Sequence, residues 1–354
     1  MSKVETGDVF KALSNKTVLI TGGTGTFGKA CIKYLRDVDY DIKIRVLSRD
    51  EFKQAQLREV YGSDNISYML GDIRDIERLR LAFAGVDIVI HAAALKHVEL
   101  GEYNPRQFID TNILGTENVC RAAIDCAVRQ VITLASDKGV NPINLYGATK
   151  MVAEKSTIQH NSYSPAVGQW PGTYFKVVRY GNVAGSRGSA IGLFQRCRDR
   201  GEPIPITDRG MTRFWMLIRE AVELVMYAII DTTRGGTYIP HLYAFDIMDL
   251  ADAISTVNGY RDVGIRPGEK LHEMLMTDHE AQRALYDSFK DFGDHSGVYV
   301  LPPAIHDWNH SHTAEGLVPA SNVLNNPYCS DGWNWRMSKT DLMRKIAYHI
   351  QDAE

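Results

Sequence analysis

The sequence is poor in cysteine, and its cysteines form no pattern of a disulfide scaffold or a thiolate metal site. The five cysteines are an odd number spread along 354 residues, and no Cys-x-x-Cys motif occurs among them. This usage argues against a disulfide-built fold and is typical of a reducing cytosol. His306, His310 and His312 are possible metal ligands, but no cysteine or carboxylate is placed to complete a site with them. We therefore expect no metal.

Long apolar runs and a strong net charge are also missing. No apolar stretch is long enough to cross a bilayer, and the first residues, MSKVETGDVF, lack the apolar core of a signal peptide. The formal net charge of -3 gives no strong attraction to nucleic acid or to an anionic membrane. These absences lead us to expect a cytoplasmic protein with a small-molecule substrate, no nucleic-acid partner and no membrane contact.

Apolar segments of strand length alternate with helical segments through the first half of the chain. A short apolar run such as residues 18–20 is typical of a strand buried on both faces. This alternation predicts a parallel sheet with right-handed crossovers, which is a Rossmann-type doubly wound α/β fold. The predicted strands cover residues 16–21, 41–48, 66–73, 86–94, 130–136 and 174–183, with helices over 75–83 and 115–127 among them.

The second half is less regular and predicts a smaller C-terminal lobe. Residues 161–172 and 303–335 have the composition of loops, whereas residues 219–230 have the pattern of a helix. We expect residues 1–183 to form the Rossmann domain, with a later segment, about 213–250, returning to it. Residues 184–354 are expected to form mainly a substrate-binding lobe and a C-terminal tail.

A glycine-rich turn joins the first predicted strand to the helix after it. Gly22, Gly25 and Gly28 form a Gly-x-x-Gly-x-x-Gly motif in the strand–turn–helix context that gives such motifs meaning. Glycines let the backbone approach a pyrophosphate, and the helix N-terminus adds free N–H groups and a positive partial charge. A turn that binds nothing is the alternative. The predicted pyrophosphate-binding residues are Gly22, Thr24, Gly25, Thr26, Phe27 and Gly28.

The end of the second strand favours NADP as the cofactor. An acidic residue usually binds the bare ribose of NAD at this point. Here Ser48 and Arg49 come first and Lys53 follows a helical turn later, which suits a ribose 2′-phosphate. Asp50 and Glu51 keep NAD possible, and a solvated helix start is the alternative to any cofactor contact. Further predicted cofactor contacts are Asp72 and Ile73 beside the adenine, Ala92, Ala93 and Lys96 toward the nicotinamide ribose, and Leu134 and Ala135.

Residues 134–150, LASDKGVNPINLYGATK, place a Tyr-x-x-x-Lys pair directly after the fifth strand. On a helix, Tyr146 and Lys150 share a face, and a neighbouring ammonium lowers the pKa of a phenol from about 10. The phenolate then takes the proton of a substrate hydroxyl while a hydride leaves the same carbon. Lys150 is also expected to donate to the nicotinamide ribose. Because ligands bind at the carboxyl ends of parallel strands, the position of this pair indicates a catalytic site.

An acid and an amine stand side by side just before this pair. Ser136 is expected to hydrogen-bond the substrate hydroxyl. Asp137 acts as a general acid if its pKa is raised, and Lys138 as a general base if burial lowers its pKa. An acid and a base around a ketone favour elimination, because oxidation of a carbon to a ketone acidifies the neighbouring C–H bond. An exposed Asp–Lys pair without function is the alternative.

Seven segments, taken in order, resemble one enzyme family. They are TGGTGTFGK, SRDEFKQ, HAAALKHV, SDKGVNPINLYGATK, VVRYGNVAGSRGS, PITDRGMTRFW and GIRPGEKLHE, over about residues 15–280. They resemble the UDP-N-acetylglucosamine 4,6-dehydratases of the extended short-chain dehydrogenase/reductase superfamily, above all the C5-inverting type of pseudaminic acid biosynthesis. The resemblance implies an NADP-dependent hydro-lyase. Its product would be UDP-2-acetamido-2,6-dideoxy-β-L-arabino-hexos-4-ulose, for surface glycan biosynthesis.

The resemblance also implies a role for each matching residue. Tyr146 with Lys150 would oxidise the sugar, and Asp137 with Lys138 would eliminate water and invert C5. Arginines suit the diphosphate and a carboxylate suits ribose hydroxyls. For Arg266 alone, a solvated loop arginine is the alternative. The residues implied for nucleotide-sugar binding are Lys96, Asn182, Val183, Arg187, Gly188, Ser189, Ala190, Ile191, Thr207, Arg213, Arg266 and Glu269.

Other functions stay open. A retaining dehydratase is one, although many retaining relatives have methionine where this chain has Tyr146. A nucleotide-sugar 4-epimerase needs only the Tyr/Lys pair and leaves Asp137 and Lys138 without a task. A non-catalytic NADP-binding regulator typically loses the tyrosine or the lysine, and both are present here. Ser136 departs from the usual threonine of the family but keeps the hydroxyl. The resemblance also suggests a homo-oligomer, a dimer or larger, formed through helices that flank Tyr146.

Overall fold

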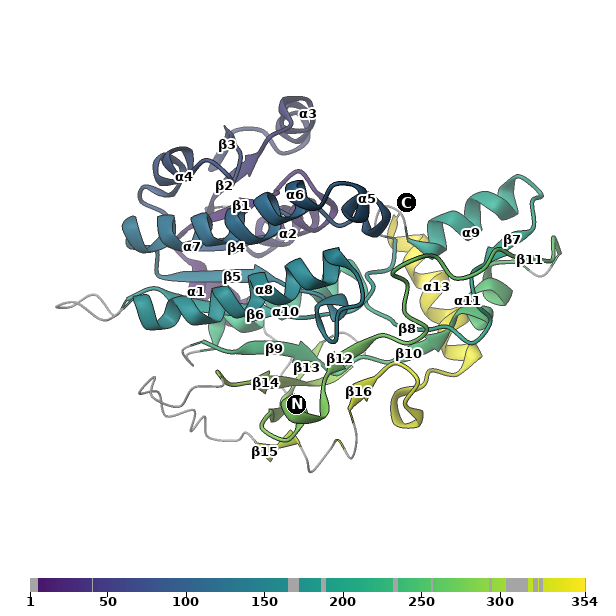
Figure 1. Ribbon diagram of the computed structural model, residues 1–354. Helices are drawn as coiled ribbons and strands as arrows, with labels where there is room; N and C mark the ends of the chain where they lie inside the picture. Colours follow the sequence, from purple (N-terminus) through teal and green to yellow (C-terminus); the bar gives the residue numbers. More distant parts are fainter. Residues whose placement is uncertain are drawn as a thin grey trace.

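The computed structural model describes residues 6–39, 41–164, 172–185, 189–231, 235–255, 257–292, 295–303, 318–320, 324 and 327–353. A large central sheet carries helices, and a smaller lobe adjoins one end of it (Figure 1). The predicted Rossmann-type α/β fold is therefore confirmed.

The central sheet is parallel through the Rossmann part and antiparallel at one edge. Neighbouring strands run parallel from β3 across to β9, whereas β14, β13 and β15 add antiparallel strands beyond it. Within the described residues the order of the sheet is β15 (Val318–Pro319), β13 (Leu285–Phe292), β14 (His295–Leu301), β9 (Thr237–Pro240), β6 (Tyr174–Val178), β5 (Gln130–Leu134), β4 (Ile88–His91), β1 (Thr17–Thr21), β2 (Lys43–Ser48) and β3 (Ile66–Leu70).

All six strands predicted from the sequence are present, and several end earlier than predicted. β3 ends at Leu70, β5 at Leu134 and β6 at Val178. The residues that follow leave the sheet at its carboxyl edge and line a cavity there. The antiparallel edge of β13 and β14 was not predicted.

Helices cover both faces of the sheet, as the side chains of β1 show. Val18 and Ile20 pack into the core beneath α2 (Thr26–Val38) and α10 (Ile218–Ile230), while Leu19 points to the opposite face. There it packs with residues of α4 (Ile76–Phe83) and α7 (Gly115–Asp125). Both faces of the strand are therefore buried, which explains its uninterrupted apolar run.

The remaining helices surround this core or connect its strands. None of the helices among the described residues is both long and apolar enough to cross a membrane. The helices that surround the core or connect its strands are α1 (Thr6–Leu13), α3 (Glu51–Tyr61), α5 (Val98–Tyr103), α6 (Pro105–Phe108), a π-helix (Ile109–Leu114), α8 (Leu145–Gln159) and 3-10 turns at Asp137–Gly139 and His160–Tyr163.

The smaller lobe has a separate apolar core formed by residues of α9 (Ala190–Asp199), α11 (Ile247–Ile254) and α13 (Lys339–Ala353). These three helices lie together at the right of Figure 1. Short strands pair around them: β7 (Ile204–Ile206) with β11 (Tyr260–Asp262), and β8 (Thr212–Phe214) with β10 (Ala244–Asp246). A third pair joins β12 (Met274–Met276), which precedes α12 (Asp278–Ala281), to β16 (Tyr328–Cys329) near the C-terminus. A 3-10 turn at Trp333–Trp335 leads into α13.

Candidate active site

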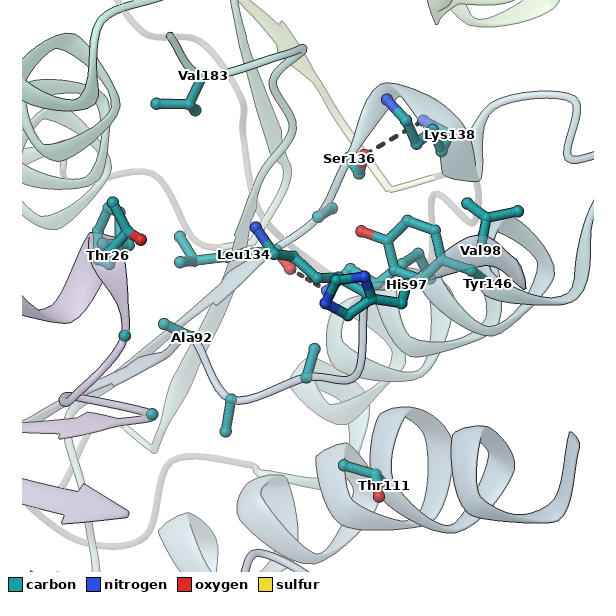
Figure 2. A pocket seen from close by; sticks show the side chains of 18 of the residues that line it. Thr26, Ala92, His97, Val98, Thr111, Leu134, Ser136, Lys138, Tyr146 and Val183 are labelled. Atoms are coloured by element: carbon teal, nitrogen blue, oxygen red, sulfur yellow. Dashed lines mark hydrogen bonds between the residues drawn. The ribbon is translucent and has the colours of Figure 1, made fainter. Parts of the chain in front are cut away.

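A cavity of about 1080 Å³ opens where the parallel strands end. Its walls are the loops that follow β1, β2, β3, β4, β5 and β6, closed on one side by residues 266–273. Figure 2 shows Ser136, Lys138 and Tyr146 on one side of this cavity and Thr26 on the other. The arrangement brings the glycine turn and the acid–base residues, more than a hundred residues apart in the chain, into one site.

The glycine turn has the shape that a dinucleotide pyrophosphate needs. Gly22 has φ of +66°, and a Cβ there would lie 2.9 Å from the backbone of Ala93. A Cβ on Gly28 would lie only 2.3 Å from the carbonyl oxygen of Gly23. Helix α2 begins with neither a side-chain cap, because Gly25 is its N-cap, nor an acidic residue in its first turn. Its first N–H groups therefore stay available for an anion in the cavity.

The cavity wall after β2 combines a hydroxyl, two cations and an acid that is already engaged. Asp50 caps α3 by accepting the N–H of Lys53 at 3.0 Å, and its carboxylate also pairs with the Lys53 ammonium. The Arg49 guanidinium is more than half exposed and lies 3.7 Å from Asp72. Ser48 is buried and accepts a hydrogen bond from Gln54 at 3.0 Å. Lys53 is thus paired with Asp50, and the largely exposed Arg49 guanidinium, at 3.7 Å from Asp72, is the cation here that is least tightly held by an acid.

Asp137 and Lys138 form a hydrogen-bonded pair at the end of β5. One oxygen of the fully buried Asp137 accepts from the Ser136 hydroxyl at 2.8 Å, the Lys138 N–H at 2.8 Å and the Lys138 ammonium at 3.1 Å. Its other oxygen is buried without a partner. Asp137 does not itself line the cavity, whereas Ser136 and Lys138 do. The pair is thus not a solvated surface pair: the acid lies beneath the lysine and orients it toward the cavity.

A third ionisable group, Glu273, faces Lys138 and was missed by the sequence analysis. Its carboxylate lies 3.4 Å from the Lys138 ammonium and is almost fully buried. Burial alone lowers the pKa of Lys138, but the carboxylates of Asp137 and Glu273 outweigh it and raise this pKa above the ordinary lysine value. The expectation that burial lowers the pKa of Lys138 is therefore wrong for this structure.

Tyr146 and Lys150 lie on one face of α8, as predicted, and both line the cavity. The phenol of Tyr146 points toward Ser136 and Lys138 in Figure 2. Its pKa is raised, because burial outweighs the lowering by the Lys138 ammonium and the Ser136 hydroxyl. Lys150 donates to the carbonyl oxygen of Leu134, and burial lowers its pKa to about 8 against the opposing charge of Glu154. The expected net lowering of the tyrosine pKa is thus not found, and the cation acting on this phenol is Lys138.

Close packing holds α8 against the Asp137–Lys138 turn. Asn144 caps the helix by accepting the N–H of Gly147 at 2.7 Å. A Cβ on Gly147 would lie 2.2 Å from the carbonyl oxygen of Lys138. Only glycine allows the backbone of the Asp137–Lys138 turn to approach α8 this closely, so the glycine after Tyr146 fixes the position of the Asp137–Lys138 pair relative to Tyr146 and Lys150.

The loop of residues 266–270 closes the cavity and is docked on the acid–base turn. Asn144 donates to the carbonyl oxygen of Gly268 at 2.7 Å, and the Lys270 ammonium donates to that of Val140 at 2.5 Å. The Arg266 side chain is half exposed, and its Nε lies 3.8 Å from a carboxylate oxygen of Glu99. The N–H of Arg266 donates to the Glu269 carboxylate at 3.3 Å. Arg266 and Glu269 therefore lie on the cavity wall but are not buried in it.

The remaining residues predicted to bind substrate are divided among three locations. Asn182, Val183, Ser189 and Arg213 line the cavity, as Lys96 does. Thr207, Ala190 and Ile191 do not line it, and Ile191 packs in the core of the smaller lobe. Arg187 and Gly188 lie outside the described residues. All predicted cofactor residues line the cavity: Gly22, Thr24, Gly25, Thr26, Phe27, Gly28, Ser48, Arg49, Asp50, Lys53, Asp72, Ile73, Ala92, Ala93, Lys96, Leu134, Ala135, Tyr146 and Lys150.

Further cavity residues were not predicted from the sequence. Thr111 has a buried hydroxyl without a partner, and Tyr180 follows β6 at the cavity wall. His97, the N-cap residue of α5, also lines the cavity. These residues share a position just after a parallel strand or on a helix that faces one. That position could have marked them in the sequence, but it led to a prediction only for residues that also belong to a motif. Among the described residues no group of three histidines, cysteines or carboxylates could hold a metal ion, and His306, His310 and His312 lie outside them.

The fold and the cavity define an α/β protein with a dinucleotide-type glycine turn facing a buried acid–base cluster. Residues 18–290 match the family model described as polysaccharide biosynthesis protein, and the chain belongs to this family.

The chain is similar to proteins with two different named activities and to a solved structure. The UDP-N-acetylglucosamine 4,6-dehydratase (inverting) of Campylobacter jejuni subsp. jejuni serotype O:23/36 (strain 81-176) is 42% identical over 293 residues, covering 82% of this chain and 84% of that protein. The UDP-glucose 4-epimerase of Rickettsia massiliae (strain Mtu5) is 40% identical over 305 residues, which cover 84% of this chain and 86% of that protein. The X-ray structure of Pen from Bacillus thuringiensis superposes with a TM-score of 0.84 at 34% identity, covering 95% of this chain and 98% of that one. The resemblance to the inverting dehydratases is confirmed.

Proposed function

We propose that this protein is an NADP-dependent UDP-N-acetylglucosamine 4,6-dehydratase that inverts C5. The observation that carries the proposal is the hydrogen-bonded Asp137–Lys138 pair beside Tyr146, with Lys138 on the cavity wall. A redox step at one carbon needs a tyrosine and a lysine, whereas loss of water needs an additional acid and base next to them. The 42% identity to an enzyme named for this reaction supports the same reading.

The residues of the cavity suit the three stages of such a reaction. A bound nicotinamide cofactor would accept a hydride from C4 of the sugar and return it at C6. Tyr146 would take the proton of the C4 hydroxyl, which Ser136 would orient. The resulting ketone acidifies C5–H. Lys138, once its ammonium has given up a proton, would remove the C5 proton while a carboxylic acid of the cluster protonates the departing C6 hydroxyl. Reprotonation of C5 on the opposite face would give the L-arabino product.

For the cofactor we propose NADP over NAD. Arg49 offers an exposed guanidinium at the ribose end of the cavity, and Asp50 both caps α3 and pairs with the Lys53 ammonium, so it is not a free carboxylate. A 2′-phosphate adds two negative charges that suit this wall, whereas an NAD ribose needs a free carboxylate there. Titration of the purified protein with each dinucleotide measures the preference, and tighter binding of NAD would contradict it.

A 4-epimerase is the second candidate, favoured by the 40% identity to proteins named UDP-glucose 4-epimerase. Incubation with UDP-N-acetylglucosamine in deuterated water, followed by NMR of the product, separates the two. An inverting dehydratase gives a 6-methyl group, a C4 ketone and deuterium at C5 with L-arabino geometry. A product that keeps its C6 hydroxymethyl group would indicate an epimerase, and a methyl product of unchanged C5 configuration would indicate a retaining dehydratase. No turnover with UDP-sugars despite tight NADP binding would favour a non-catalytic regulator.

We further propose that the protein is a cytoplasmic homo-oligomer of a surface glycan pathway, with pseudaminic acid as the end product. All five cysteines are free thiols, as in a reducing compartment. Helix α5 packs against α8, and Leu100, Tyr103, Met151 and Val152 on these helices expose apolar side chains that a second copy would cover. The molar mass from light scattering tests the assembly: a monomer at micromolar concentration would contradict it.

A further inference from the structure

Two carboxylates among the described residues pair with the Lys138 ammonium, those of Asp137 and Glu273, and of these two Glu273 lines the cavity. It precedes β12 and is the last residue of the segment GIRPGEKLHE, to which the sequence assigned a role only at Arg266 and Glu269. One of its carboxylate oxygens lies 3.4 Å from the Lys138 ammonium, and the other is buried without a hydrogen-bond partner. A buried carboxylate with an open oxygen is costly unless it serves the site.

The C-terminal segment holds Glu273 in place through its backbone. The N–H of Glu273 donates to the Ser330 hydroxyl at 2.9 Å, and the N–H of Ser330 donates to the Glu273 carbonyl oxygen at 2.8 Å. Ser330 also hydrogen-bonds Thr212 at 2.6 Å. These backbone bonds do not involve the carboxylate, so the fold does not require an acidic side chain at this position. The carboxylate itself is directed at Lys138.

We propose that Glu273 is a positioning residue for Lys138, which holds its ammonium at the cavity wall and takes up its proton when the amine acts on the substrate. The inference rests on the proposed dehydration. A proton moves from the Lys138 nitrogen to the Glu273 oxygen, which leaves a neutral amine and a carboxylic acid. The amine then accepts the C5 proton, and the electron pair of that C–H bond passes into the C4 ketone as an enolate. No oxidant or reductant enters this step.

The surroundings of the pair agree with this role. Burial raises the pKa of Glu273 while Lys138 opposes the rise, so this carboxyl holds a proton more readily than an exposed glutamate does. Asp137 and Tyr146 face Lys138 from the acid–base turn and α8, and Arg213 and Lys270 lie near enough to act on Glu273. Asp137 already accepts three hydrogen bonds on one oxygen and lies outside the cavity lining. Glu273 is therefore better placed to exchange a proton with the lysine.

The test is Glu273→Gln, which keeps the size and the backbone bonds but removes the charge. At neutral pH, kcat is expected to fall by about tenfold or more, with KM changed much less, because the ammonium has lost its internal proton acceptor. Activity then depends on release of the Lys138 proton to water, so it rises by about tenfold per pH unit toward the lysine pKa, while the wild type changes less. Glu273→Asp restores the charge and part of the wild-type profile. Asp278→Asn, an exposed carboxylate five residues away, is the matched control and keeps the wild-type profile.

A second measurement needs no turnover and so separates this inference from the proposed reaction. NMR titration of ¹³Cε-labelled lysine, with the Lys138 signal assigned from Lys138→Ala, reports the pKa of Lys138 directly. Loss of an opposite charge within about 4 Å is expected to lower this pKa by about one unit or more in Glu273→Gln. An unchanged Lys138 pKa, or a kcat reduced equally at every pH, would overturn the role of Glu273. Failure of the wild type to form a ketone would refute the dehydratase proposal and leave this titration decisive.

Discussion

Gly147→Ala tests whether the closeness of α8 and the acid–base turn is needed for catalysis. An alanine Cβ would lie 2.2 Å from the Lys138 carbonyl oxygen and 3.0 Å from the Pro142 side chain, so the turn must retreat by about 1.2 Å to reach ordinary van der Waals contact. Where nothing crowds the new side chain, replacing glycine by alanine inside a helix stabilises the fold by up to about 1 kcal/mol. Overpacking costs about 1–3 kcal/mol. A displacement of about 1 Å between Lys138 and Tyr146 is expected to lower kcat by about 100-fold.

Gly192→Ala is the matched control for this substitution. Gly192 is likewise the third residue of its helix, and its N–H is bound by the cap residue Ser189, as that of Gly147 is bound by Asn144. A Cβ on Gly192 meets nothing nearer than 3.4 Å. Thermal unfolding and ketone formation are measured for both variants. If Gly147→Ala unfolds at the wild-type temperature and keeps the wild-type kcat, the close approach has no catalytic meaning and the reasoning is refuted.

Three further predictions concern the phenol, the cofactor wall and a buried ion pair. Tyr146→Phe fills the same buried space and is expected to lower kcat by about 10²–10⁴-fold with little change in unfolding temperature; an active variant would remove the tyrosine from the mechanism. Arg49→Ala is expected to weaken NADP binding more than NAD binding in calorimetric titrations, and equal losses would contradict the assigned 2′-phosphate contact. Arg179 lowers the pKa of the partly buried Glu280 to about 2 from an ordinary value of about 4.5, although burial opposes this. Because the folded-state pKa is depressed, this stabilisation is present above about pH 4.5 and is lost as the pH falls toward about 2. The free energy of unfolding, measured by denaturation at a series of acidic pH values, should therefore depend less on pH in Glu280→Gln than in the wild type. An equal pH dependence would refute the assignment.

Much of the Rossmann part could be predicted because its local and global signals agree. Strands β1, β4 and β5 are largely apolar and buried on both faces, and the glycines at 22 and 28 stand where a side chain would collide with the backbone of Ala93 and Gly23. The antiparallel edge was missed for the opposite reason. β13 reads LYDSFKDF, and its alternation is broken by charges at Asp287, Lys290 and Asp291. Such a strand is recognisable only once its partner β14 is known.

The candidate site was predictable where a motif marked it and missed where only folding brings residues together. The Tyr146–Lys150 pair is local in sequence, so its geometry follows from helix periodicity. Glu273 reaches Lys138 across 135 positions of the chain, and no spacing rule connects them. The predicted pKa directions were wrong for two reasons. The adjacent Asp137 and the distant Glu273 together raise the pKa of Lys138 against the effect of burial, whereas burial itself raises the pKa of Tyr146. Thr207 and Ile191, assigned by resemblance, pack outside the cavity lining.

The most direct test of the central claim is solvent exchange at C5 in the Lys138→Ala variant. Wild-type protein and variant are each incubated with UDP-N-acetylglucosamine and NADP in deuterated water, and the sugar is followed by NMR. The account predicts that the wild type incorporates deuterium at C5 and forms a 6-methyl group, whereas Lys138→Ala, still folded and still binding NADP, does neither. Deuterium at C5 and a methyl product at the wild-type rate in Lys138→Ala would show that this lysine is not the base and would contradict the account.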